Sequence, residues 1–446
     1  MAKPKAKAAP LKLFLTTGDS TEEFQVALDG KTVTTQSGPR YSSKTKTLTL
    51  ATPDKAKAKY DQLVADKRVQ GYRELGEVDK PTVAIARDEA LESAIRERRD
   101  DAAPYLVYAD WLQAQGSQVG EMLVLAQRNK PKQAMAIASK LGLPSAGLAT
   151  FGWRFGVWQW LRLDNAVDQM DDTWDPVAFA RALFGSPLCV ALEDLRIGML
   201  RWNFQDQPDV IAEAGRHGWA RDLRGLVVGD VDGNIDMAHH AIGDVGKAIS
   251  KNFPNLVSLT LHSGAQSWRG TKETFGVAGL DLPKLTDLTI ETCAMSGKRM
   301  KAVAAANLPA LEKLVLWFGA RDRDANAKVA DVAPVFDRVR FPRLKHLGLR
   351  NTELVTDLVR LLPAAKIAKQ LETLDLSMGT MSDEDAAELA ESAAQFTSLK
   401  TLNVDDNFVS ASGARQLKAA FKGVAVSAKD PKETYDEDER YVSVSE

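Results

Sequence analysis

The sequence predicts an α/β fold in which a long solenoid of strand-and-helix repeats follows two smaller N-terminal units. A short leucine pattern recurs nine times from residue 158 onward, and helical patterns separate its copies. The first 80 residues instead carry the strand and turn patterns of a small separate unit. In such a solenoid each repeat adds one strand to a parallel sheet on the concave face and one helix to the opposite face.

Composition places the chain among ordinary folded proteins. Of 446 residues, 44% are hydrophobic and 26% are charged, with a net charge of −2, which excludes wholesale disorder and a global field for nucleic acid. Two cysteines exclude a disulfide framework and a multi-thiolate zinc domain. Residues 1–10 predict a basic disordered tail without the apolar core of a secretory signal, and no apolar run is long enough to span a membrane. We therefore expect a cytoplasmic protein with no membrane partner.

Residues 11–78 are expected to form a small α+β domain. A helix is predicted at 54–69, because Thr52-Pro53 is a typical helix start, and Asp29-Gly30 predicts a hairpin turn. Strands are expected at 13–16, 23–28, 31–35 and 45–50.

The segment 24–35, together with a helix that leads into Tyr72, resembles a WGR domain. That family is a small sheet-plus-helix module of DNA-dependent poly(ADP-ribose) polymerases and of many bacterial proteins. In its DNA-binding members the signature Trp and Arg contact nucleic-acid ends. Here Ser37-Gly38-Pro39 stands in place of Trp-Gly-Arg, and Arg40 follows one position later.

The N-terminal domain has a local excess of positive charge. Residues 1–80 carry 15 Lys and Arg against 10 Asp and Glu. Arg40, Lys44 and Lys46 are therefore candidates for contact with a polyanion. The alternative is a basic face that is simply solvated.

Residues 83–150 predict a short helical domain. The run Pro104-Tyr-Leu-Val-Tyr-Ala-Asp-Trp-Leu112, with Gly120-Glu-Met-Leu-Val124 after it, closely resembles the bacterial repeat-companion domain over residues 86–128. Members of that family often directly precede leucine-rich repeats in bacterial proteins. Tyr108 and Trp111 lie three residues apart on one helical face, and we expect both in the core.

The solenoid is predicted over residues 151–428. The pattern Leu-x-x-Leu-x-Leu, with Val, Ile or Trp as substitutes, recurs at intervals of 26 to 34 residues. Its last two apolar positions alternate with polar ones, as in a short strand with one buried face. The nine copies begin at Trp158, Leu192, Leu223, Leu256, Leu285, Leu311, Leu344, Leu371 and Leu399.

Helical patterns separate the strands, for example at 354–369, 382–396 and 410–421. One strand and one helix per repeat, with a period of about 28 residues, resembles the leucine-rich repeat of the ribonuclease-inhibitor type. That family places Asn or Cys at the ninth position of its pattern, where Cys293 and Asn407 stand in two of the repeats. We expect Cys293 to fill a buried structural position rather than to act as a reactive thiol.

No recognisable catalytic or cofactor motif occurs in the sequence. It contains no phosphate-binding loop, His-Glu-x-x-His, Gly-x-Ser-x-Gly or calcium-binding loop. His239 and His240 are adjacent, so on the helix predicted at 236–250 they would point in different directions and could not share a metal. We predict no enzyme activity, no cofactor and no metal site. An enzyme with an unrecognised catalytic set is the alternative that a single sequence leaves open.

The predicted function therefore rests on the concave surface of the solenoid. Side chains between the buried leucines are expected to fall there into three rows, with one residue per strand. The rows mix both charge signs and lack the uniform Lys and Arg lining that a phosphate backbone requires. The candidate partner-binding residues are Trp160, Arg162, Arg196, His262, Glu291, Trp317, Arg350, Asp375 and Asp405.

Two groups in these rows favour protein binding. Trp317, flanked by Glu291 and Arg350, has the composition of a protein–protein hot spot, although it could instead lean over neighbouring strands. Arg162 and Arg196 are neighbours in one row and suit a carboxylate of a partner.

Residues 429–446 predict an acidic C-terminal tail. Its alternating end, 441–444, could add a strand that caps the open edge of the array. The helical domain is expected to shield the opposite end. The sequence thus predicts a non-enzymatic bacterial scaffold or recognition protein that binds a protein through its concave face. The alternative is a nucleic-acid-associated regulator acting through the basic WGR-like domain.

Overall fold

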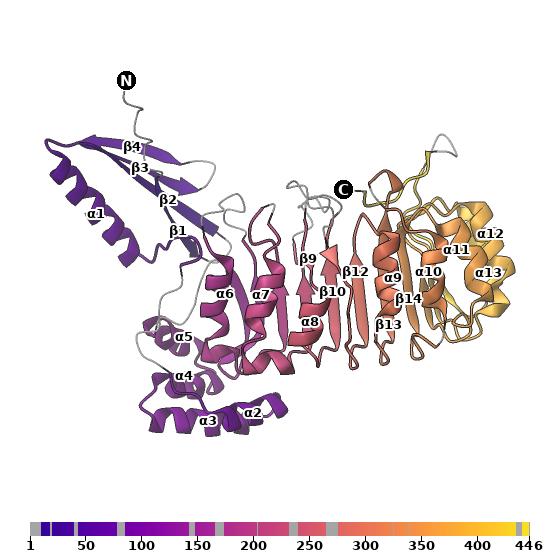
Figure 1. The fold of residues 1–446 in the computed structure, drawn as a ribbon, viewed down its shortest axis with the longest axis horizontal. Helices are drawn as coiled ribbons and strands as arrows, with labels where there is room; N and C mark the ends of the chain where they lie inside the picture. The colour runs from indigo at the N-terminus through magenta and orange to yellow at the C-terminus, as the bar shows by residue number, and fades with distance from the viewer. Residues whose placement is uncertain are drawn as a thin grey trace.

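A computed structural model describes residues 10–17, 20–39, 43–77, 85–141, 148–165, 174–202, 204–231, 240–264, 275–323, 325–337, 339–433 and 439–445. Figure 1 shows a small sheet with one helix, a group of helices and a long row of strands with helices along one side. The fold is therefore α/β, as the sequence predicts. None of the helices in the described ranges is both long and apolar enough to cross a membrane.

The N-terminal unit is a four-stranded antiparallel sheet with one helix. Its elements are β1 (Leu11–Thr17), β2 (Ser20–Asp29), β3 (Thr32–Pro39), β4 (Lys44–Thr49) and α1 (Pro53–Val69). Asp29 pairs with Thr32 across a two-residue turn, in which Gly30 adopts a φ of 56° that glycine tolerates best. The hydroxyl of Thr52 accepts a hydrogen bond from the backbone N–H of Lys55 and so caps α1. A separate small core holds the unit together, built on Leu13, Phe24, Val26, Val33, Ala56 and Tyr72.

Four helices follow in the chain. They are α2 (Glu89–Glu97), α3 (Ala102–Ala114), α4 (Gln118–Gln127) and α5 (Pro131–Lys140). Tyr108 is buried, and its hydroxyl donates to the carboxylate of Glu92 over 2.8 Å. Trp111 is only half-buried and stacks on the ring of Tyr108. Of the two residues predicted to lie in the core, Tyr108 is therefore fully buried and Trp111 only partly.

The repeats form one sheet of 11 strands. In sequence order these are β5 (Ala149–Arg154), β6 (Val157–Leu163), β7 (Asp194–Ile197), β8 (Gly225–Val228), β10 (Ser258–His262), β12 (Asp287–Glu291), β13 (Lys313–Gly319), β14 (His346–Thr352), β15 (Thr373–Asp375), β16 (Thr401–Asn403) and β17 (Ala425–Ser427). From β6 to β17 all neighbours are parallel, and β5 pairs antiparallel with β6 at the edge. All nine predicted repeat strands are present, as β6 to β8, β10 and β12 to β16. A separate two-stranded sheet joins β9 (Gly243–Asp244) to β11 (Phe275–Gly276).

Helices lie along one side of this sheet (Figure 1). They are α6 (Pro176–Phe184), α7 (Gln207–Ala214), α8 (Gly246–Asn252), α9 (Gly297–Ala305), α10 (Val329–Val332), α11 (Val355–Leu361), α12 (Asp383–Glu391) and α13 (Ala411–Ala420). Short 3-10 turns are η1 (Pro187–Cys189), η2 (Gly218–Asp222), η4 (Arg321–Arg323), η5 (Ala333–Phe336), η6 (Leu362–Ala364) and η7 (Ala393–Gln395).

Two of the predicted helices have different bounds in the structure. The helix expected at 354–369 ends at Leu361, because Pro363 has no N–H to continue it and lies in a 3-10 turn. The helix expected at 236–250 begins only at Gly246, since Gly243 and Asp244 form β9. His239 lies outside the described residues.

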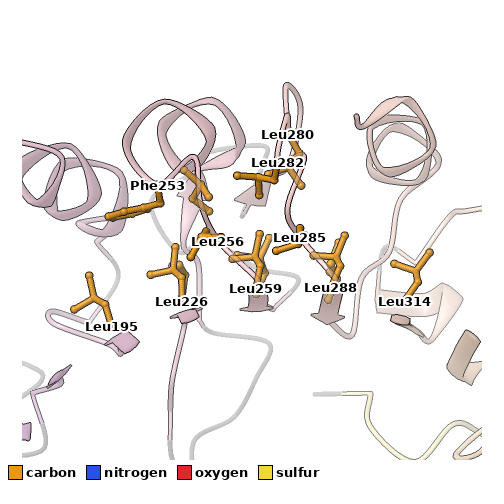
Figure 2. Close-up of a cluster of buried hydrophobic side chains, with 14 of the residues drawn as sticks. Leu195, Leu226, Phe253, Leu256, Leu259, Leu280, Leu282, Leu285, Leu288 and Leu314 are labelled. Carbon is orange, nitrogen blue, oxygen red and sulfur yellow. The ribbon is translucent and has the colours of Figure 1, made fainter. Parts of the chain in front are cut away.

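The core of the array is a stack of leucines between strands and helices. Figure 2 shows Leu195, Leu226, Leu259, Leu288 and Leu314, one from each of five neighbouring strands, pointing toward the helices. The strands in this view follow an arc with the helices outside, so the bare strand face is concave. The nine copies of the leucine pattern thus supply one continuous apolar layer.

The two ninth-position residues are both buried, and the sequence predicts this for Cys293. The side-chain amide of Asn407 donates to the carbonyl of Leu376 over 2.9 Å, and its oxygen accepts from the N–H of Met381 over 3.0 Å. Asn407 therefore ties its own repeat to the preceding one. Cys293 is fully buried beside the ring of Trp317.

The helical unit and the first repeats share one core. Arg96 pairs with the carboxylate of Asp222 over 2.9 Å, and Arg99 donates to the carbonyl of the same residue over 2.7 Å. Gly156, in the turn between β5 and β6, lies so close to Leu123 of α4 that an added Cβ would approach it to 2.9 Å. The end of the array is therefore covered by the antiparallel strand β5 with α4 against its turn.

The C-terminal end is capped differently from the prediction. Segment 441–444 forms no strand; the last strand is β17, which pairs with β16. The reason is that the polar groups of this segment bond to loops rather than to a strand edge, as in the bond from the N–H of Ser443 to the carbonyl of Met378. Residues 1–9 of the predicted basic tail (1–10) and residues 434–438, which hold most of the acidic run, lie outside the described residues.

Candidate partner-binding surface

The strand face carries two continuous rows of outward side chains. Neighbouring members are register partners in adjacent strands, so they stand about 5 Å apart. One row is Trp160, Asp194, Gly225, Ser258, Asp287, Lys313, His346, Thr373 and Thr401. The other is Arg162, Arg196, Val227, Thr260, Thr289, Val315, Gly348, Asp375 and Asn403. The rows have the membership that strand alternation in the sequence predicts.

The two arginines of the second row differ in their surroundings. Arg162 pairs with Asp164 over 3.1 Å and with Asp230 over 2.8 Å, so its charge is already balanced. Arg196 is its register partner on β7 and is exposed. It forms no hydrogen bond or ion pair with any residue that the structure describes. Of the two, Arg196 has the donors to offer a partner.

Asp194 and Trp160 complete this end of the face. Asp194 is exposed and leans over Gly225, where an added Cβ would meet its carboxylate. Partial burial and the neighbouring carboxylate of Glu193 raise the pKa of Asp194 above its ordinary value. Trp160 is half-buried and packs over Gly152 of β5, which has no side chain to displace it. This end therefore offers an aromatic surface beside two exposed charges of opposite sign.

His262 and Glu291 lie opposite each other on β10 and β12, in the third predicted row. Their side chains approach to 3.3 Å, between Nδ1 of the imidazole and a carboxylate oxygen. Nε2 of His262 is buried and makes no hydrogen bond with the described residues. The pair is half-buried and linked within the face rather than free.

Trp317, Arg350 and Asp375 form a second linked group. The guanidinium of Arg350 lies 5.2 Å from the centre of the Trp317 ring, and it approaches the carboxylate of Asp375 to 3.6 Å. Arg350 also donates to the hydroxyl of Ser377 over 3.0 Å. The tryptophan is half-buried under this arginine. Its ring therefore packs on its neighbours and is also partly exposed, so the structure is compatible with both hypotheses for Trp317, packing over the strands and contact with a partner.

Asp405 has a clear role in the fold. Its carboxylate accepts hydrogen bonds from the hydroxyl of Ser427 over 2.7 Å and from the N–H of Lys429 over 2.6 Å. Both donors belong to β17 or the turn after it, so Asp405 fastens the last strand. It contributes less to a free binding surface than the sequence suggests.

Two of the candidate polyanion contacts lie on the N-terminal sheet and not on this face. Lys44 and Lys46 are exposed on β4, an edge strand whose six residues are all exposed. Arg40 lies outside the described residues. The two lysines point to the same side of the strand, since they are two residues apart.

The His and Cys side chains of the described ranges were the remaining candidates for a metal or catalytic site. No group of three His, Cys, Asp or Glu side chains there could hold a metal ion. His240 is buried, and burial lowers its pKa to about 3, so the imidazole is neutral at physiological pH. Cys189 is buried as well, and burial raises the pKa of its thiol.

The chain is similar in fold to a solved bacterial protein. A structural-genomics protein from Bacteroides fragilis superposes with a TM-score of 0.55 and 17% identity, over 98% of this chain and 99% of that one. A leucine-rich-repeat protein from Leptospira interrogans covers 59% of this chain and 76% of its own, with 12% identity and a TM-score of 0.17. No protein-family model matches the chain, and no curated protein does. The first likeness extends to all parts of the chain and concerns the fold alone.

One set of contacts on this surface is not apparent from the sequence. The C-terminal residues 441–444 return to the carboxyl ends of β14 and β15, where Asn351 and Met378 hold them. The alternation of apolar and polar residues at 441–444 was the available signal, and it predicts a strand. It does not say which residues the segment would meet, because the contacts join positions up to 93 residues apart.

Proposed function

We propose that this chain is a non-enzymatic recognition or scaffold protein of the bacterial cytoplasm that binds a protein partner through its concave strand face. The proposal rests on one observation above all: the outward side chains of the strands form unbroken rows in register across the sheet. A surface of this kind is extended and rigid, and suits a large partner better than a small molecule.

The face has the mixed character of a protein interface. At its N-terminal end an aromatic side chain, Trp160, lies beside Asp194 and Arg196, which are both exposed. Tryptophan and arginine dominate the binding energy of protein interfaces. Gly225 and Gly348 stand in the same rows, and the side chains of Asp194 and Val315 lie next to them. Opposite charges on one strand favour a partner that is itself polar and of mixed charge.

Affinity purification with charge-reversal variants tests the proposal. The tagged full-length chain is recovered from its own cells, and co-purifying proteins are quantified for wild type, Arg196→Glu and Lys313→Glu, both exposed on the strand face. Arg415→Glu is the matched control, because Arg415 is exposed on α13 at the opposite side of the sheet. We expect at least one protein to fall about tenfold or more with both strand-face variants and to stay with the control. Equal recovery with all four chains would remove the strand face as the binding surface.

A second candidate function is contact with nucleic acid through the N-terminal unit. We infer that this unit is a WGR-like module, in keeping with its four-stranded antiparallel sheet and single helix. The observation that favours the function is the exposed pair Lys44 and Lys46 on β4. A gel shift with the full chain and duplex DNA at about 50 mM salt tests it, with Lys44→Gln and Lys46→Gln combined as the variant. No shift at this salt concentration would remove the candidate, as would a shift that the variant leaves unchanged.

A further inference from the structure

Three consecutive repeats turn in the same unusual way where their strands end. Asn351, Met378 and Asp406 each stand five residues after the first paired residue of β14, β15 and β16. Their φ angles are 54°, 68° and 55°, in the left-handed region that side chains other than glycine rarely adopt. The repetition of this backbone shape gives the carboxyl edge of the sheet a regular row of turns.

The C-terminal segment lies across these turns. The N–H of Ser443 donates to the carbonyl of Met378 over 3.0 Å. Its hydroxyl lies 3.2 Å from the same carbonyl and 2.5 Å from a carboxylate oxygen of Asp406. One residue of the segment therefore bonds to two successive turns at once.

Asn351 holds the next residue by its backbone. Its side-chain oxygen accepts from the N–H of Val444 over 2.8 Å, and its side-chain amide donates to the carbonyl of Val444 over 2.7 Å. Asn351 is fully buried, so both bonds are shielded from water. A clamp of this kind recognises an extended peptide unit and not a particular side chain.

The side chain of Val444 supplies the apolar contact. It packs against the buried Cys293, as does Trp317, whose ring lies under the guanidinium of Arg350. The segment therefore meets the same buried residue as Trp317, one of the candidate binding residues.

Lys432 anchors the start of this return path. Its N–H donates to the carbonyl of Asn407 over 2.7 Å, and its amine donates to the carbonyls of Gly379 and Tyr441 over 3.0 and 2.9 Å. The amine of Lys432 thus joins Tyr441, nine residues further along the chain, to the turn that follows β15.

From these contacts we propose that the carboxyl edge of β13 to β16 is a groove for an extended polypeptide segment of a partner protein, which residues 441–444 occupy within the chain until the partner displaces them. The partner segment offers one extended peptide unit to Asn351, with a β-branched apolar side chain at that residue and a hydroxyl residue before it. The inference deepens the proposed function, on which it rests, by naming a site and the chemistry of the segment that enters it.

The tail is an incomplete occupant of this groove. The indole N–H of Trp317, which packs against Cys293 as Val444 does, is buried and makes no hydrogen bond with the described residues. A partner segment that brings a carbonyl to this donor gains a bond that the tail lacks. A second copy of this chain has the same tail and no such advantage, and the tethered tail competes at a high effective concentration. The occupant that displaces the tail is therefore a different protein.

Binding of a labelled peptide in trans tests the groove. The probe is a fluorescent peptide of residues 440–446, Arg-Tyr-Val-Ser-Val-Ser-Glu. The tail of the full chain is released by Ser443→Pro with Val444→Lys, which removes the N–H and the hydroxyl of residue 443 and replaces the apolar contact of residue 444 by a charged side chain. We expect the release variant to bind the probe about tenfold or more tightly than wild type, because its own tail no longer competes. Anisotropy titration measures both affinities.

Substitutions in the groove distinguish specific binding of the probe from non-specific binding. In the release variant, Asn351→Asp keeps a residue that tolerates the left-handed turn but removes the amide donor, and should weaken probe binding about tenfold. Asn403→Asp is the matched control, since Asn403 lies on β16 and its side chain accepts the N–H of Asp405 rather than a group of residues 441–444. A probe with Lys in place of its second Val should not bind. Circular dichroism verifies folding, and Ser443→Pro alone serves as a milder release variant.

Several outcomes would overturn the inference. A folded release variant that does not bind the probe refutes the groove, and so does equal binding by wild type. A wild-type dimer that the release variant loses, seen by light scattering after gel filtration, would assign the groove to tail exchange between copies instead. If the groove fails while Arg196→Glu still loses a co-purifying protein, the proposed function stands and only this site is wrong.

Discussion

Replacing Asn407 by leucine should destabilise the last repeats of the array. The side chain is 1% exposed, and its amide and oxygen satisfy the carbonyl of Leu376 and the N–H of Met381 over 2.9 and 3.0 Å. Leucine has the same branching and the same number of side-chain heavy atoms, with methyl groups in place of the amide atoms, so it fills the site and keeps water out. The carbonyl and the N–H would then be buried without partners.

The size of the effect follows from the orphaned groups, which include the carbonyl of Val404, to which the amide also donates over 3.2 Å. A buried polar group without a partner costs about 1–3 kcal/mol, so their loss should lower the free energy of unfolding by about 3 kcal/mol or more. Asn403→Leu is the matched control. Asn403 is half-buried on β16 and accepts only the N–H of Asp405 over 3.0 Å, which solvent can replace. Its substitution should cost less than about 1 kcal/mol.

Urea unfolding followed by circular dichroism measures the difference, as a shift of the midpoint at constant slope. Repeat arrays can unfold in parts, so amide exchange should be read as well. Faster exchange is expected at β15, β16 and Met381, with β7 and β8 unchanged. Equal midpoints for Asn407→Leu and Asn403→Leu, or unchanged exchange at Met381, would refute the reasoning that this side chain joins the repeats.

Two further predictions concern stability. Gly319→Ala should lower the free energy of unfolding by more than about 2 kcal/mol, because an added Cβ would lie 1.8 Å from the carbonyl of Cys293 and the residue has a φ of 87°. Gly30→Ala is the control: its φ is 56° and the space around it is open, so the loss should be only about 1 kcal/mol. A thermal or urea melt measures both, and equal losses would contradict the prediction. Burial holds the pKa of His240 at about 3 against 6.5 in the unfolded chain, so the unfolded state binds the extra proton between these values and stability falls as pH drops below 6.5. By pH 5 this amounts to roughly 2 kcal/mol, and His240→Phe should remove that part of the acid sensitivity in paired urea melts at pH 7 and pH 5.

Much of the array could be read from local pattern. A strand with one buried face alternates, and the copies recur with the length of one strand and one helix, so the nine strands and their outward rows follow from spacing alone. The helix ends were harder to place, as at Leu361, because a proline or a short strand interrupts the helical pattern. The capping strand was assigned to 441–444, whereas β17 takes that place, since alternation does not say what a segment pairs with.

By itself the sequence determined the α/β class, the repeat strands and which side chains share a row on the strand face, because these depend on contacts within or between successive repeats. Only the tertiary structure decided which of those side chains are available. Arg162 is paired and Arg196 is open, although their local patterns are alike. The clamp between Asn351 and Val444 likewise joins residues 93 apart, where no periodic signal reaches. The sequence of a repeat determines its contacts with the adjacent repeats. Which side chains of the surface are paired or covered depends instead on contacts with residues far away in the chain.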